Sequence, residues 1–112
     1  MKIGKVNILG IEYEIHSQTS SENVKLTDND GICEYYAHKI ILDLSHMNED
    51  LVWDNKLEYY RHVLRHEIIH ALLHEAGLSN YSQDEALVEA LAILYPKMLD
   101  TMISVEIEFP EG

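Results

Sequence analysis

The sequence predicts an α+β fold, with a small antiparallel sheet in the N-terminal half packed against two helices from the C-terminal half. The first 44 residues alternate between apolar and polar side chains, which is the period of a strand. Residues 49–103 instead repeat their apolar side chains at spacings of three and four, which is the period of an amphipathic helix. The length of 112 residues and a hydrophobic content of 46% are typical of one folded domain, which we expect to cover residues 1–112.

The first predicted element is a hairpin. In the segment KVNILGIEYEIH the apolar residues nearly alternate around Gly10, which indicates two strands joined by a tight turn or a bulge. The segment VKL at 24–26 predicts a short strand, and residues 28–31 predict a turn. The segments ICEYYA and KIILDL predict two further strands, joined at residues 38–39. We therefore expect three or four strands with mostly antiparallel pairing.

The helical half divides into two helices and a tail. The residues that define the apolar face of the first helix are Leu57, Tyr60, Leu64, Ile68, Ala71 and Leu72. Gly77 is the residue type that follows the last turn of a helix, so it predicts the end of this one. We expect the second helix to begin at Ser82 and to end or kink at Pro96, which has no backbone donor. The acidic tail VEIEFPEG is consistent with either a strand or a frayed end.

The composition excludes several classes of function. The chain has 20 acidic residues against 8 lysines and arginines, a net charge of −12, and no basic cluster for binding nucleic acid or an anionic membrane. Its one cysteine, Cys33, cannot form an intrachain disulfide, which favours a reducing compartment. The sequence begins without the apolar run of a signal peptide and contains no apolar stretch of about 18 residues. We therefore expect a cytoplasmic protein.

The strongest chemical signal is the pattern H-E-x-x-H within the first predicted helix. His66 and His70 lie one turn apart on the same face, about 6 Å along the axis, so their imidazoles can converge on one tetrahedral metal ion. Glu67 is displaced around the helix and can take a proton from a metal-bound water. His62 and His74 extend the same stripe, but only the central pair has a glutamate directly after its first histidine. We expect the outer two to be polar lining or surface residues.

A catalytic zinc ion requires a third protein ligand, and the start of the second predicted helix offers two acidic candidates. Glu85 and Glu89 share one face of that helix. Ser82 to Glu85 also matches a capping box, in which Glu85 would bond the Ser82 amide instead of a metal. Spacing leaves both roles of Glu85 open. It also leaves Glu89 open as a ligand or as an acceptor that orients a histidine.

These two helical motifs together resemble the gluzincin metallopeptidases, whose second motif reads N-E-x-x-x-D. By position, the resemblance implies that Glu85 is the third zinc ligand and that Glu89 orients the first histidine, with Asp84 in the place of the asparagine. A closer likeness is to small zincin-like proteins encoded by bacteriophages and prophages. The segments that carry this likeness are residues 10–15, 31–35, 66–78 and 85–92. A looser likeness is to the ImmA/IrrE-type proteases, through H-E-x-x-H-x-L-L-H ending at His74.

The resemblance implies a zinc-dependent metallopeptidase in the cytoplasm of a bacterium or a phage-infected host cell. It would hold one Zn²⁺ per chain through His66, His70 and Glu85, and Glu67 would serve as the general base for hydrolysis of a peptide or protein substrate. An extended peptide could then pair with residues 39–44, if that strand is an edge of the sheet. The candidates for stabilising the oxyanion are Tyr35, Tyr36, His46 and Tyr81.

An alternative function belongs to a different class. An acidic phage or mobile-element protein can bind a basic, nucleic-acid-binding surface of a host protein, with a metal site that is retained or vestigial. The acidic residues are scattered along the chain, which favours solubility over mimicry of nucleic acid. Substitution of Glu67 by Gln separates the two interpretations, because it should abolish hydrolysis and leave such binding intact.

Overall fold

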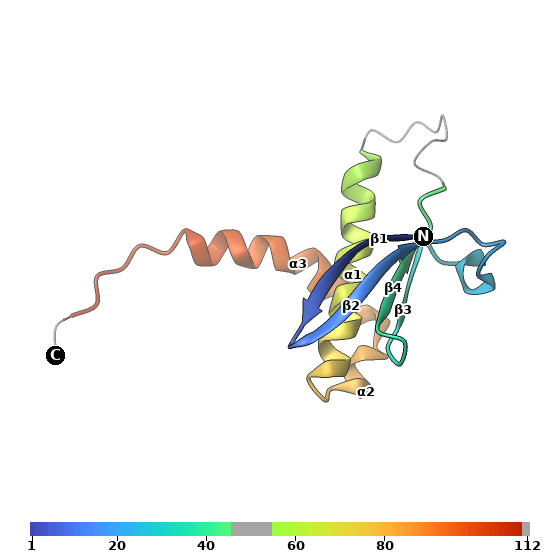
Figure 1. Cartoon of the computed structure of the whole chain (residues 1–112). Coiled ribbons are helices and arrows are strands. Elements are labelled where there is room, and N and C mark those ends of the chain that lie inside the picture. The colour runs from blue at the N-terminus through green and yellow to red at the C-terminus, as the bar shows by residue number, and fades with distance from the viewer. Residues whose placement is uncertain (46–54, 111–112) are drawn as a thin grey trace.

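The computed structural model describes residues 1–45 and 55–110, and it confirms the predicted α+β class. A four-stranded sheet in the N-terminal half packs against the first long helix of the C-terminal half, and the last long helix packs against that helix in turn (Figure 1). The strands are β1 (Lys2–Ile8), β2 (Ile11–Ser17), β3 (Gly31–Glu34) and β4 (Lys39–Leu42). The helices are α1 (Lys56–Glu75), α2 (Ser79–Ser82) and α3 (Glu85–Ile103), with a short 3₁₀ helix, η1 (Val24–Thr27), between β2 and β3.

The predicted hairpin is confirmed. β1 and β2 pair in an antiparallel register that brings Ile8 opposite Ile11. The two residues between them, Leu9 and Gly10, have φ angles of 51° and 94°. Positive φ at both positions is the geometry of a tight hairpin turn, and glycine adopts it without steric cost.

The sheet is mixed, so the expectation of antiparallel pairing was wrong for one pair of strands. The strand order is β1-β2-β4-β3, and β2 and β4 are parallel, whereas β3 and β4 are antiparallel. The reason is the long connection through η1 and β3, which supplies the crossover that a parallel pair needs. This order makes β4 an interior strand, so the expected addition of a peptide along residues 39–44 was also wrong. The edge strand on this side is β3.

The segment VKL forms η1 and not the strand that its composition predicted. The Asn23 side chain accepts a hydrogen bond from the Lys25 amide, at 3.1 Å, and so caps the 3₁₀ turn. Leu26 is the buried residue of this turn. A local side-chain cap therefore outcompetes strand pairing here.

The core lies between one face of the sheet and α1. Its buried members are Ile8, Tyr13, Ile40, Leu42 and Ala71. The Tyr13 hydroxyl also donates a hydrogen bond to Glu75, at 2.7 Å, and so ties β2 to the last turn of α1. Burial of these side chains holds α1 at a fixed position across the sheet.

The predicted end of the first helix is confirmed, whereas the predicted start of the second helix is wrong and that helix does not end at Pro96. Gly77 follows the C-cap of α1 with a φ of 79°, as its position in the sequence predicted. The last long helix begins at Glu85 instead of Ser82, and it continues through Pro96 to Ile103. Pro96 supplies no backbone donor, yet the helix continues for a further seven residues beyond it. Residues 105–110 form neither helix nor strand, and none of the described helices is long and apolar enough to cross a bilayer.

Candidate metal centre

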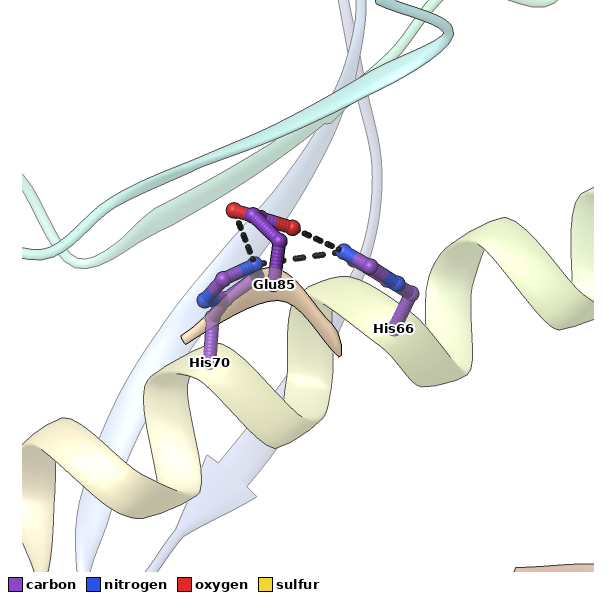
Figure 2. Close-up of side chains that lie close together, drawn as sticks. All are labelled: His66, His70 and Glu85. Atoms are coloured by element: carbon purple, nitrogen blue, oxygen red, sulfur yellow. Dashed lines mark hydrogen bonds and ion pairs between the residues drawn. The ribbon is translucent and has the colours of Figure 1, made fainter. Parts of the chain in front are cut away.

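Two helices bring His66, His70 and Glu85 to one point (Figure 2). The Nε2 atoms of the two histidines are 3.2 Å apart. The Glu85 carboxylate lies 3.0 Å from Nε2 of His66 and 3.2 Å from Nε2 of His70. All candidate ligand atoms lie within 4.8 Å of one another, so these three residues could hold a metal ion. The i, i+4 spacing on α1 therefore produces the convergence that it predicted.

Glu85 is free to face the histidines because another residue caps its helix. The Asp84 side chain accepts a hydrogen bond from the Leu87 amide, at 3.1 Å, which makes Asp84 the N-cap of α3. The capping box from Ser82 to Glu85 is therefore wrong. Ser82 belongs to α2 and is buried, whereas the Glu85 side chain is 71% exposed at the mouth of the site.

The orientation of His70 is fixed by the backbone of α2. Nδ1 of His70 donates a hydrogen bond to the Ser82 carbonyl oxygen, at 2.7 Å. In return the Ser82 hydroxyl donates to the His70 carbonyl oxygen, at 3.0 Å. Because a carbonyl oxygen can only accept, the proton of neutral His70 lies on Nδ1, and the lone pair of Nε2 faces Glu85.

His66 is oriented by a carboxylate instead. Its Nδ1 lies 3.2 Å from Glu89, which also accepts from Nε2 of His62, at 2.7 Å. Burial of Glu89 opposes its charged form, but the hydrogen bonds from the two histidines outweigh it and lower its pKa. The charged carboxylate holds the proton of neutral His66 on Nδ1, so the lone pair of Nε2 also faces Glu85. Glu89 therefore contacts the nitrogen of His66 that does not face the candidate metal site.

The three converging groups fit a cation. When both imidazoles are neutral, each Nε2 presents a lone pair, and the Glu85 carboxylate has no proton to donate. The two Nε2 atoms are 3.2 Å apart, and their lone pairs repel one another unless a proton or a metal ion lies between them. Imidazole nitrogen and carboxylate oxygen are ligands that zinc accepts, and three of them leave one coordination position open.

Glu67 lies beside this group but does not belong to it. The residue is 6% exposed and lines the same cleft as His66 and His70. Burial raises the pKa of Glu67 to about 7; the His66 imidazole opposes this shift only when it is protonated, and the negative charge of Glu85 adds to the shift. A carboxyl group with such a pKa can both accept and release a proton near neutrality.

The cleft in front of these residues has a volume of about 310 Å³ and is bounded by α1 and the edge strand β3. The two elements approach closely at Gly31. A Cβ atom there would lie 2.7 Å from the Val63 side chain and 3.1 Å from Cγ of Glu67. The sequence placed Gly31 in a predicted turn and in the segment 31–35 that carries the resemblance, but it did not predict this close contact. The lack of a side chain at Gly31 is what allows β3 to lie against Glu67.

Three of the four oxyanion candidates are tyrosines. Of these, Tyr35 is the one that lines this cleft. Its hydroxyl lies 2.7 Å from the Ser82 hydroxyl and donates to it, since Ser82 uses its own proton on His70. Its ring stacks on His74 at 4.4 Å. Tyr36 is 95% exposed, Tyr81 is exposed outside this cleft, and His46 lies outside the described residues.

The outer histidines of the stripe are placed as expected. His62 lines a smaller cavity beside Glu89, and His74 packs against Tyr35. Neither belongs to the candidate metal group of the described chain.

Comparisons with protein-family models, with curated proteins and with solved structures found no match to this chain.

Proposed function

We propose that this protein is a zinc-dependent metallopeptidase, in which His66, His70 and Glu85 hold one Zn²⁺. The observation that carries the proposal is the convergence of two imidazole Nε2 atoms and a carboxylate at a cleft that also contains the buried Glu67. The resemblance of the two helical motifs to the gluzincins supports the same assignment.

Each residue of the site has a defined task in this proposal. A zinc ion, when bound, would act as a Lewis acid on a substrate carbonyl and make water a stronger acid. Glu67 accepts a proton from the attacking water and then delivers it to the leaving amine. Glu89 and the Ser82 carbonyl keep the two imidazoles in the tautomer that turns Nε2 toward the ion. The Tyr35 hydroxyl lines the same cleft and is the described candidate for contacting the developing oxyanion, to which it would donate the proton that it gives to Ser82 in this structure.

The proposed substrate is an extended peptide, bound along β3. This strand pairs with β4 on one side and is an edge of the described sheet, so its outer backbone groups face away from the ladder. It also forms one wall of the cleft. A peptide added as a further strand would therefore lie next to Glu67 and the candidate ligands.

The test is hydrolysis of a peptide library by zinc-loaded protein, read by mass spectrometry. We expect cleavage by the wild type and a loss of at least 100-fold in Glu67→Gln, which keeps the size of the side chain and removes its basic oxygen. Glu58→Gln, on the exposed first turn of the same helix, is the matched control and should retain activity.

Zinc binding must be measured in the same samples. Cleavage that survives in Glu67→Gln would contradict the role of Glu67. A zinc-loaded wild type that cleaves no peptide would contradict the peptidase assignment and favour an acidic interaction protein that retains a metal site.

A further inference from the structure

The C-terminal part of α3 and the tail that follows it project away from the sheet and α1 (Figure 1). Among the exposed large hydrophobic side chains of the described chain, ten of twenty lie in this segment of 17 residues, which we call the arm (residues 93–109). They are Ile93, Leu94, Tyr95, Met98, Leu99, Met102, Ile103, Val105, Ile107 and Phe109. The buried residues of α3, Val88 and Ala92, both precede it. A helix that carries apolar side chains on several faces requires a partner that covers them.

An apolar groove lies at the base of the arm. It has a volume of about 220 Å³ and is lined by Arg65, Ile68, Ile69 and Leu72 of α1 and by Tyr95 of α3. Because arm and groove adjoin in one chain, two chains related by a twofold axis can each place an arm on the groove of the other. Such an exchange buries the arm and the groove of both chains. It gives a closed dimer, in which neither surface remains exposed for a third copy.

The tail of the arm has the pattern of a strand. In residues 105–109 the apolar side chains alternate with Glu106 and Glu108, which places the two carboxylates on one face of an extended chain. No described strand pairs with this segment. The 19 residues of α3 form a helix about 28 Å long, which carries the tail away from its own sheet.

The free edge of β1 is complementary to this tail. β1 pairs with β2 alone among the described strands, and it carries Lys2, Lys5 and the exposed Ile3. The two lysines already form ion pairs with the β2 carboxylates at 3.4 and 3.5 Å, with side chains still 47% and 66% exposed. Opposite charges on neighbouring strands stabilise their pairing, so an acidic strand fits beside this edge.

We propose that the arm binds a second copy of this chain. Met98 and Met102 lie in the apolar groove of the partner, the tail adds to the partner's β1, and the exchange is reciprocal. This inference does not depend on the metal site or on peptidase activity. The apolar pattern, the adjoining groove and the complementary charges of tail and β1 all come from the same chain, which is why a second copy is the occupant.

The first test is the molar mass in solution, measured by light scattering with the full chain. At about 50 µM we expect twice the 12.9 kDa of one chain. Met98→Glu/Met102→Glu should return the mass to that of one chain, while its circular dichroism spectrum stays that of the folded protein. The matched control, Val24→Glu/Leu57→Glu, changes two exposed hydrophobic residues outside the arm and should remain a dimer. A wild type with the mass of one chain, or a dimeric Met98→Glu/Met102→Glu, would overturn the proposal, even if the arm captured some other protein.

A charge exchange tests where the tail lies. Glu106→Lys/Glu108→Lys and Lys2→Glu/Lys5→Glu should each weaken the dimer about fivefold. The combination of all four substitutions should restore most of that loss, because the opposite charges face each other again. Lys2→Glu/Lys5→Glu also opposes Glu12 and Glu14 within the same chain, but only pairing between copies predicts the rescue. A combined variant as weak as the weaker parent would refute the position of the tail on β1.

Discussion

Replacement of Gly31 by alanine tests how closely the edge strand is held against the helix that carries the site. A Cβ atom at this position would lie 2.7 Å from Cγ1 of Val63, 3.1 Å from Cγ of Glu67 and 3.3 Å from Cδ2 of Leu42. The first of these distances is shorter than any ordinary carbon contact, so β3 or Val63 must move. Overpacking by one methyl group in a core costs about 1 to 3 kcal/mol.

The expected result is a lower melting temperature. With an unfolding entropy of about 2.1 cal/mol/K per residue, a chain of 112 residues loses about 4 °C per kcal/mol. Gly31→Ala should therefore unfold about 4 to 13 °C below the wild type, as followed by circular dichroism of the metal-free protein.

Two further variants make this experiment specific. Gly4→Ala is the matched control in another strand, because its Cβ would meet only Ile15, at 3.9 Å, and its melting temperature should change by less than 2 °C or so. Val63→Ala removes the atom that causes the closest contact, so it should cost less in the Gly31→Ala background than alone. A Gly31→Ala protein that melts within about 1 °C of the wild type would refute the close approach of β3 to α1.

Two other predictions concern side chains around the cleft. Glu89→Ala should weaken zinc binding about 10- to 100-fold, measured by competition with a chromophoric chelator, because His66 loses the acceptor that orients it; Asp100→Ala on the exposed end of α3 is the control, and equal affinities in both would contradict this role. Burial raises the pKa of Cys33 from 9.0 to about 12, so its alkylation by iodoacetamide at about pH 8.5 should be at least 100-fold slower in the folded, metal-free protein than in denaturant. The pKa of this thiol is higher in the folded than in the unfolded protein. Its contribution to the free energy of unfolding is therefore fully present below pH 9 and is lost as the pH rises toward 12. Equal alkylation rates in the two states would show that the thiol is not buried.

The sequence predicted those features that depend on local periodicity. The spacing of His66 and His70 fixes their common face on any α-helix, and the alternation around Gly10 produces a hairpin wherever a tight turn is possible. Both features appear in the structure as expected. The convergence of Glu85 on the same point required only that the next helix return alongside α1, which the length of the connection allowed.

The features that the sequence left open depend on contacts between distant segments. Ser82 and Asp84 are both good N-cap residues, and the choice between them follows from the hydrogen bond of Ser82 to the His70 backbone. The Ser82 carbonyl that orients His70 has no side-chain signature at all. The parallel pairing of β2 with β4 arises from a crossover whose path the strand patterns do not encode.

The most direct test of the account is the stoichiometry of zinc binding, measured by elemental mass spectrometry and by titration of metal-free protein. We expect one zinc ion per chain in the wild type, and none in His66→Ala, His70→Ala or Glu85→Ala. His74→Ala lies one turn further along the same helix and should still bind one ion, because His74 contacts Tyr35 and not the candidate ligands. A wild type that takes up no zinc, or a Glu85→Ala variant that binds it as tightly as the wild type, would contradict the assignment of this site.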